Sequence, residues 1–245
     1  MSAQEESFIS HLVELRDRLL RALVVVVVVF ACLMPWAGDI YDILAQPMMQ
    51  ALPEGTRMIA TGVVTPFFVP MKVTLLVAFV IALPFVLYQA WAFIAPGLYA
   101  HEKRLGLPLV IGSTILFLAG MAFCYFFVFG TVFKFIAQFA PKSITPAPDI
   151  EQYLAFVMSM FLAFGITFEV PVFVIVLVKM GVVDVVKLKE ARPYVIVGAF
   201  VVAAVVTPPD VVSQLMLAVP MCLLYELGIF LARFVGKTRA EAVAE

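Results

Sequence analysis

The chain has 245 residues, of which 64% are hydrophobic and only 13% are charged, and its mean hydropathy is +1.10. A disordered chain needs low hydrophobicity and high charge, so this class is excluded. A soluble enzyme with so few charges would leave too much apolar surface uncovered. The 16 basic and 17 acidic residues nearly cancel, so no nucleic-acid partner is predicted. The composition predicts an integral membrane protein.

Long apolar stretches divide the chain into predicted transmembrane helices, because a spanning helix needs about 20 mostly apolar residues. The predicted helices lie near residues 20–38, 70–97, 106–134, 152–179, 193–207 and 211–232, within a single membrane domain of residues 1–245. Porin-type strands would alternate polar and apolar residues, whereas the run of valines at 24–29 does not alternate. The expected fold is therefore an all-α polytopic membrane protein.

The first 20 residues are predicted to form a cytoplasmic amphipathic arm. Apolar and polar side chains fall on two separate faces at helical spacing. The apolar face carries Phe8, Leu12, Leu15 and Leu19, and the polar face carries Ser7, His11, Glu14, Arg18 and Arg21. Such a helix is expected to lie at the membrane surface and to run into the first span. That span has no small-residue cleavage site after it, which favours a retained helix over a signal peptide.

The basic residues predict the orientation, since cytoplasmic loops of membrane proteins are enriched in Lys and Arg. Twelve basic residues fall on one side of the predicted spans and four on the other. The first set is Arg16, Arg18, Arg21, Lys103, Arg104, Lys179, Lys187, Lys189, Arg192, Arg233, Lys237 and Arg239; the second is Arg57, Lys72, Lys134 and Lys142. Both termini are therefore predicted in the cytoplasm. Aromatic residues near span ends, such as Trp36 and Trp91, are predicted to lie in interfacial belts.

The fifth and sixth helices are predicted to be short. Residues 194–206 give about 20 Å of helix against about 30 Å of hydrocarbon. The sequence at 207–210, Thr-Pro-Pro-Asp, then requires a turn. We therefore expect local bilayer thinning or coverage by a partner here, with Asp210 below the headgroup plane.

Two loops on the opposite side from the termini are rich in proline. Residues 39–71 contain Pro47, Pro53, Pro66 and Pro70, so any helix there is expected to be short. A surface helix is predicted at 41–49, with Pro47 as a structural turn. Residues 134–151 form the second loop, and the two loops together are candidates for a cap over this face.

Glu169 is the most unusual ionisable residue, because it lies ten residues before Lys179 and thus about 15 Å from the end of its span. A charge at that depth pairs, faces water or takes up a proton. Pro171 is expected to open the helix locally. Gln214 is predicted at nearly the same height, which would form a polar patch at mid-membrane. The alternative is a protonated glutamate that only holds helices together.

Other carboxylates and the cysteines have simpler interpretations on spacing alone. Glu14 has Arg18 four residues later, which is the spacing of an ordinary helical ion pair. Glu102 stands in a loop beside two basic residues. The zinc-protease pattern that begins at His101 fails at Leu105. Both histidines lie outside the spans, which disfavours a serine intramembrane protease. The three cysteines lie in apolar spans and predict neither a disulfide framework nor a zinc site, and no cofactor is expected.

Several short stretches, spread over nearly the whole chain, together resemble the TatC family, the six-span subunit of the twin-arginine protein translocase. They are residues 11–18, 65–68, 87–99 with Glu102, 163–165, 168–171, 192–194 and 207–210. No single stretch is decisive, but their joint occurrence in this order is specific.

The resemblance implies a receptor for signal peptides of folded cargo that carry two consecutive arginines. Glu14 and Glu102 match the family positions that contact those arginines, and a guanidinium pairs with a carboxylate through a planar fork. The signal's apolar segment would lie against a concave face of the helices. The other residues predicted for this binding site are His11, Arg16, Phe93, Leu98 and Tyr99.

The resemblance also implies partners and an energy source. Glu169, with Gln214, is expected to meet polar residues of single-span TatA-like and TatB-like subunits in a multi-copy complex in the bacterial cytoplasmic membrane. The family draws on the proton gradient. Two alternatives remain: a proton-coupled small-molecule transporter that uses Glu169, and a purely structural membrane scaffold. The transporter predicts paired broken helices, which the sequence does not show.

Overall fold

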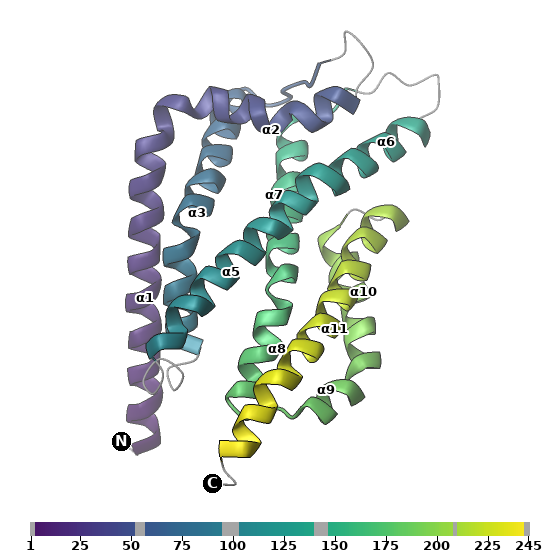
Figure 1. Cartoon of the computed structure of the whole chain (residues 1–245). Helices are drawn as coiled ribbons and strands as arrows, with labels where there is room; N and C mark the ends of the chain where they lie inside the picture. Colours follow the sequence, from purple (N-terminus) through teal and green to yellow (C-terminus); the bar gives the residue numbers. More distant parts are fainter. Residues whose placement is uncertain (1–2, 52–56, 95–102, 140–146, 208–209, 243–245) are drawn as a thin grey trace.

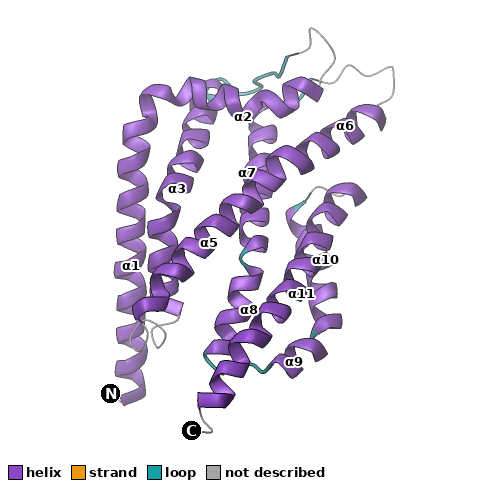
Figure 2. Cartoon of the chain, in the orientation of Figure 1, coloured by secondary structure: helices purple, strands orange, loops and turns teal. Residues whose placement is uncertain are grey.

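The computed structural model describes residues 3–51, 57–94, 103–139, 147–207 and 210–242. Figure 2 shows that the described chain is almost entirely helical. In chain order the elements are α1 (Ala3–Leu33), the 3-10 turn η1 (Met34–Trp36), α2 (Ala37–Ala51), α3 (Thr65–Ile94), α5 (Lys103–Phe123), the π-helical turn η2 (Cys124–Val128), α6 (Phe129–Phe139), α7 (Ile150–Phe168), α8 (Val170–Lys179), α9 (Val185–Glu190), α10 (Arg192–Val206) and α11 (Val211–Ala242). The prediction of an all-α membrane protein is confirmed.

Five helical runs of the described chain are long and apolar enough to cross a membrane, and a sixth apolar helix is shorter. The five runs are Ile9–Gln50, Thr65–Ile94, Gly106–Gln138, Ile150–Lys179 and Val211–Phe234, and the shorter helix is Arg192–Val206. In Figure 1, α1 begins and α11 ends at the same end of the bundle. We call this the termini end, and the opposite end, where the described residues 57–64 and 147–149 lie, the loop end.

The amino-terminal arm and the first span form one straight helix (Figure 1). α1 runs for 31 residues without a Gly or Pro, so nothing in the sequence bends the chain where the arm was expected to meet the span. The arm expected over residues 1–20 is therefore, where described, the first part of a rod and not a separate helix at an angle to it.

α2 lies across the loop end at a large angle to α1 (Figure 1), which confirms the short helix predicted at 41–49. Pro47 lies inside this helix, so its prediction as a turn is wrong. A helical proline lacks the N–H that would bond the carbonyl four residues earlier. Here the Tyr125 hydroxyl donates to the Ile43 carbonyl at 3.2 Å, and the Tyr153 hydroxyl donates to the next carbonyl, of Leu44, at 2.9 Å. These two bonds satisfy α2 carbonyls at the proline and tie α2 to η2 and α7.

The last two spans differ from each other in length. α10 has 15 residues, about 22 Å of helix, as predicted for a short fifth span. α11 has 32 residues, so the prediction of a short sixth helix is wrong. Its apolar part alone, Val211–Phe234, has 24 residues. The prediction counted apolar residues only, whereas the Arg, Lys, Glu and Ala that follow are good helix formers outside lipid.

The core lies where α5, η2 and α6 cross α7. Phe129, Phe161 and Phe164 are buried there in one aromatic cluster, with ring centroids of Phe129 and Phe161 5.2 Å apart. Glycine allows the close crossing, because a Cβ on Gly120 would lie 2.5 Å from the Phe164 carbonyl oxygen. On one side of this core α1 packs on α3, and on the other side α8 and α10 pack on α11.

The two long loops meet at the loop end through a short parallel bridge. The Ile59 N–H donates to the Pro148 carbonyl at 3.0 Å, and the Ile150 N–H donates to the Ile59 carbonyl at 2.9 Å. Lys72 and Glu151 form an ion pair at 2.9 Å beside this bridge. The described parts of both loops are therefore joined across the ends of α3 and α7.

Candidate functional site

A cluster of polar and aromatic side chains joins α1 to the last turns of α3. Arg18 Nε and Nη2 donate to Glu14 Oε1 at 2.9 and 2.7 Å, and Arg18 Nη1 donates to Gln89 Oε1 at 3.3 Å. Positions 14 and 18 fall on one face of α1, one turn apart, and this face packs on α3. A carboxylate here already holds a guanidinium.

An aromatic contact lies on the same two faces. The rings of His11 and Phe93 stack with centroids 4.3 Å apart and planes at 16°. His11 lies one turn before Glu14 and Leu15, and Phe93 lies one turn after Gln89, so helical spacing places both contacts side by side. The structure thus brings together three predicted site residues, His11, Glu14 and Phe93.

The described part of this cluster does not contain the remaining predicted residues of the site. Arg16 pairs with Asp17 at 2.8 Å, and two-thirds of its side chain is exposed. Leu98, Tyr99 and Glu102 lie outside the described residues. The second carboxylate predicted to receive an arginine therefore stays a prediction.

The Glu14–Arg18 pair is the helical ion pair that was the simpler interpretation of this spacing. Its side chains are 41% and 24% exposed, and exposed pairs at this spacing contribute about 0.3–0.5 kcal/mol. Both bonds end on one oxygen, Oε1. The pair is therefore weak, and the carboxylate keeps capacity for a further donor.

Glu169 lies at the junction of α7 and α8, as its proximity to Pro171 predicted. α7 ends at Phe168 and α8 begins at Val170, so the helix is interrupted at the glutamate itself. The residue is only 4% exposed, and neither carboxyl oxygen has a hydrogen-bond partner among the described residues. Such a group is costly to bury and calls for a donor or a proton.

Gln214 does not reach Glu169. Gly228 of α11 packs on α8, where a Cβ would lie 3.0 Å from both Pro171 Cα and Val174 Cβ. Gln214 lies 14 residues before Gly228, about 21 Å along the helix. Its amide instead donates to the Phe200 carbonyl at 3.3 Å. The polar patch expected from these two side chains is therefore not formed within the chain.

The height of α10 explains this separation. The prediction assumed that the short hairpin of the last two spans ends about 20 Å above the inner surface, near which Lys179 ends α8. The Arg192–Glu226 ion pair, at 2.6 Å, instead places the start of α10 opposite the part of α11 that faces Pro171. Because α9 lies between α8 and α10, the α10–α11 hairpin, and Gln214 with it, lies closer to the loop end (Figure 1).

Asp210 begins α11 as a helix cap. Its Oδ1 accepts a hydrogen bond from the Ser213 N–H at 2.7 Å, which is the capping geometry that aspartate favours. Its other oxygen, Oδ2, and the Ser213 hydroxyl are buried without a partner among the described residues. Asp210 thus caps the start of α11, and its predicted role in the turn between the last two spans stays a prediction.

Sequence reasoning missed three residues that line these contacts. Gln89 binds Arg18, and Trp91 donates its indole N–H to the Ser113 hydroxyl at 2.8 Å. Trp91 is 2% exposed, so its predicted place in an interfacial belt is wrong. Their polarity could have identified two of them in the sequence, because Gln89 and Ser113 are isolated polar residues inside apolar stretches.

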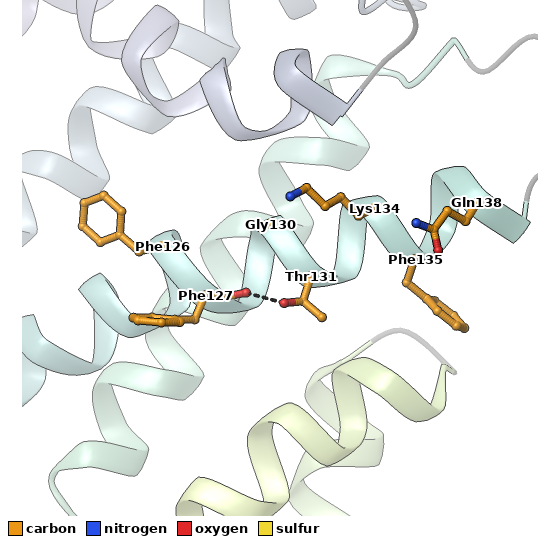
Figure 3. Close-up of a pocket in the computed structure, with 7 residues that line it drawn as sticks. All are labelled: Phe126, Phe127, Gly130, Thr131, Lys134, Phe135 and Gln138. Atoms are coloured by element: carbon orange, nitrogen blue, oxygen red, sulfur yellow. Dashed lines mark hydrogen bonds between the residues drawn. The ribbon is translucent and has the colours of Figure 1, made fainter.

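A separate hollow of about 450 Å³ lies along one face of η2 and α6 (Figure 3). It is lined by Phe126, Phe127, Gly130, Thr131, Lys134, Phe135 and Gln138. The Thr131 hydroxyl donates to the Phe127 carbonyl within this wall at 2.8 Å. The hollow holds none of the predicted site residues. In the described part of the chain no group of His, Cys, Asp or Glu side chains is arranged to hold a metal ion.

Comparison with known proteins gives one consistent result. The family model described as Sec-independent protein translocase protein (TatC) matches residues 10–220. The TatC protein of Escherichia coli K12 is 50% identical over 241 residues, covering 98% of this chain and 93% of that protein. The TatC protein of Haemophilus influenzae is 53% identical over 236 residues, covering 96% and 92%.

Solved structures agree in fold and in sequence. The structure titled Crystal Structure of Twin Arginine Translocase Receptor-TatC superposes with a TM-score of 0.80 at 40% identity. The match covers 92% of this chain and 99% of that one. The fold, the helix order and the short motifs all agree with this comparison: the chain belongs to the TatC family and is a membrane component of the Sec-independent, twin-arginine protein translocase.

Proposed function

We propose that this chain is the receptor for signal peptides with two consecutive arginines and the core scaffold of a translocase that exports folded proteins across an energised bacterial cytoplasmic membrane. One observation carries the proposal: the Glu14 carboxylate already binds a guanidinium, that of Arg18. The site therefore has the chemistry that an incoming arginine requires.

The chemistry of this cluster favours arginine over lysine. A guanidinium presents several N–H donors in one plane and pairs with two acceptors at once, as Arg18 does with Glu14 and Gln89. An ammonium group is a point charge and cannot form this fork. Glu102 is the proposed second carboxylate, and the stacked rings of His11 and Phe93 offer an apolar surface beside the first.

Arg16, Leu98 and Tyr99 complete the proposed peptide site. Arg16 is exposed beside the cluster, and the other two follow α3 along the chain. Because the Glu14–Arg18 pair contributes only about 0.3–0.5 kcal/mol, its replacement by a signal arginine costs little.

The test is binding of a photoreactive signal peptide to the chain in membranes, with an Arg-Arg or a Lys-Lys pair. In the double variant Glu14→Gln, Glu102→Gln, crosslinking of the Arg-Arg peptide should weaken at least about tenfold, because two charge-assisted hydrogen-bonded contacts are lost. The Lys-Lys peptide should bind poorly to both proteins.

Glu151→Gln is the matched control, since this carboxylate pairs with Lys72 at the loop end, far from the cluster. It should bind the Arg-Arg peptide as the unaltered chain does. Undiminished binding in the double variant would refute the assignment of Glu14 and Glu102.

We infer a second contact, with single-span TatA-like and TatB-like subunits in a multi-copy complex. Glu169 lacks a donor among the described residues, and a polar side chain of such a subunit would supply one. Gln214 is proposed as a further polar contact near the start of α11. The short helix α10 exposes an apolar stripe suited to a neighbouring helix, formed by Tyr194, Val197, Val201 and Val205.

A further inference from the structure

The Ser113 hydroxyl of α5 accepts a hydrogen bond from a residue of another helix, α3. Trp91 Nε1 donates to Ser113 Oγ at 2.8 Å, and the two residues are 2% and 0% exposed. The Trp91 ring is held in turn against Phe173 of α8, with centroids 4.9 Å apart. A serine hydroxyl that accepts from an indole still has a proton of its own to donate.

The usual acceptor for that proton is not used. Five other hydroxyls, four within helices and one directly after α10, donate to the carbonyl four residues earlier: those of Thr74, Thr114, Thr131, Ser159 and Thr207. Among the described residues, Ser113 makes no such bond with Leu109, although its neighbour Thr114 bonds Val110 at 2.8 Å. The Ser113 proton is therefore left for an acceptor across the helix interface.

The register of α5 against α7 places Glu169 there. The two helices run in opposite directions (Figure 1), and a Cβ on Gly165 would lie 2.4 Å from the Phe117 ring. Ser113 is one turn before Phe117, and Glu169 is one turn after Gly165, so both lie one turn further along the same interface. The Ser113 side chain is close enough to interact with the Glu169 carboxyl group.

We propose that Ser113, oriented by Trp91, is the internal hydrogen-bond donor that holds the Glu169 carboxyl group. The register of α5 on α7 places the hydroxyl on the same stretch of the interface as the carboxyl group. Ser113 thereby satisfies a 4%-exposed acid that has no other donor among the described residues. Trp91 acts through Ser113 and is a positioning residue.

The role of this hydrogen bond in the translocase rests on the proposed role of Glu169 as a partner contact. Ser113 then supplies the donor when no partner is bound, and a polar side chain of the partner replaces it on assembly. The hydrogen bond itself does not depend on that role, so the two are tested separately.

Infrared spectroscopy of the purified chain in lipid, with isotope-labelled glutamate, tests the bond directly. The band that disappears in Glu169→Gln belongs to this carboxyl group. We expect Ser113→Ala to shift that band, because the carboxyl group loses its donor, and Trp91→Phe to shift it in the same direction. Ser159→Ala is the matched control, since its hydroxyl bonds the Ala155 carbonyl at 2.7 Å, and it should leave the band in place.

An unchanged band in Ser113→Ala overturns the proposal. If that variant does not fold, Trp91→Phe decides in its place, and an unchanged band there overturns the proposal equally.

Crosslinking to the single-span partners gives the second readout. Ser113→Ala alone should change the yield of this crosslinking. In a chain that already carries Glu169→Gln, adding Ser113→Ala should have no further effect, and a merely structural role of Ser113 would not produce this dependence. If Glu169→Gln leaves partner crosslinking intact while the band still shifts, the proposed partner role fails and the Ser113 bond stands.

Discussion

The Asp149 carboxylate at the loop end both caps α7 and binds Thr61 of the other loop. Its Oδ1 accepts from the N–H groups of Glu151 and Gln152 and so caps α7, while its Oδ2 accepts from the N–H and the hydroxyl of Thr61 in the other loop. The Thr61 hydroxyl, followed by the backbone N–H of Gln152, holds the pKa of Asp149 below its ordinary value. The ionised form therefore favours the folded chain.

This shift predicts a pH dependence at the loop end. A group with a lowered pKa in the folded state adds stability above its unfolded pKa, and that stability is lost as the pH falls through the folded pKa. Asp149→Asn should lower the melting temperature in detergent at neutral pH, and the difference from the unaltered chain should close as the buffer is acidified.

Asp184→Asn is a suitable control, because Asp184 precedes α9 without a side-chain capping bond. It should change neither the melting temperature nor its pH profile. A melting temperature of Asp149→Asn that tracks the unaltered chain at every pH would contradict the argument.

Single residues also explain how α2 is attached. Pro47 removes one helical N–H, and tyrosine hydroxyls from η2 and α7 bond the carbonyls of Ile43 and Leu44. A proline that looks like a helix breaker in the sequence is accommodated because these side chains satisfy backbone groups near it.

At the scale of elements, the crossing of α5 on α7 depends on two glycines. A Cβ on Gly120 would lie 2.5 Å from the Phe164 carbonyl oxygen, and one on Gly165 would lie 2.4 Å from the Phe117 ring. The first contact is with backbone, which cannot rotate away. This crossing sets the register that brings Ser113 opposite Glu169.

Gly120→Ala should therefore destabilise the chain by about 1–3 kcal/mol, the usual cost of overpacking a well-packed interior. Gly112→Ala in the same helix has nothing within 4 Å of its Cβ. It should be neutral or stabilise by up to about 1 kcal/mol, because alanine favours a helix over glycine. Reversible denaturation in mixed detergent measures both, and equal stability of the two variants would refute the role of Gly120.

At the scale of the whole molecule, the two ends of the bundle differ in charge. The termini end carries the basic residues of α1 and α9, and the loop end carries few. The excess of Lys and Arg at cytoplasmic ends predicts that both termini face the cytoplasm.

Cysteine labelling tests this orientation in a chain whose cysteines, Cys32, Cys124 and Cys222, are replaced by Ala. An impermeant maleimide should label Lys189→Cys only in inverted vesicles and Arg57→Cys only in right-side-out vesicles. Both positions are exposed in the structure. The opposite pattern would reverse the proposed topology.

Much of the fold follows from the sequence, because apolar length and periodicity are local properties. They predicted the spans, the short α10, the surface helix α2 and the interruption at Glu169 before Pro171. The length of α11 escaped this reasoning, since a helix continues beyond lipid wherever its residues favour it. The helical spacing of Glu14 and Arg18 likewise predicted their ion pair.

Relations between helices were decided only by the tertiary structure. Gln89 meets Arg18, Trp91 meets Ser113, and Gln214 lies about 21 Å along α11 from the level of Pro171. Each depends on register, which is set by the packing of residues far apart in sequence, such as Gly120 on Phe164. The sequence by itself therefore determined which segments are long and apolar enough to cross a membrane and which few side chains are costly there. Packing decided which of those side chains meet, because close contact between helices leaves few registers open.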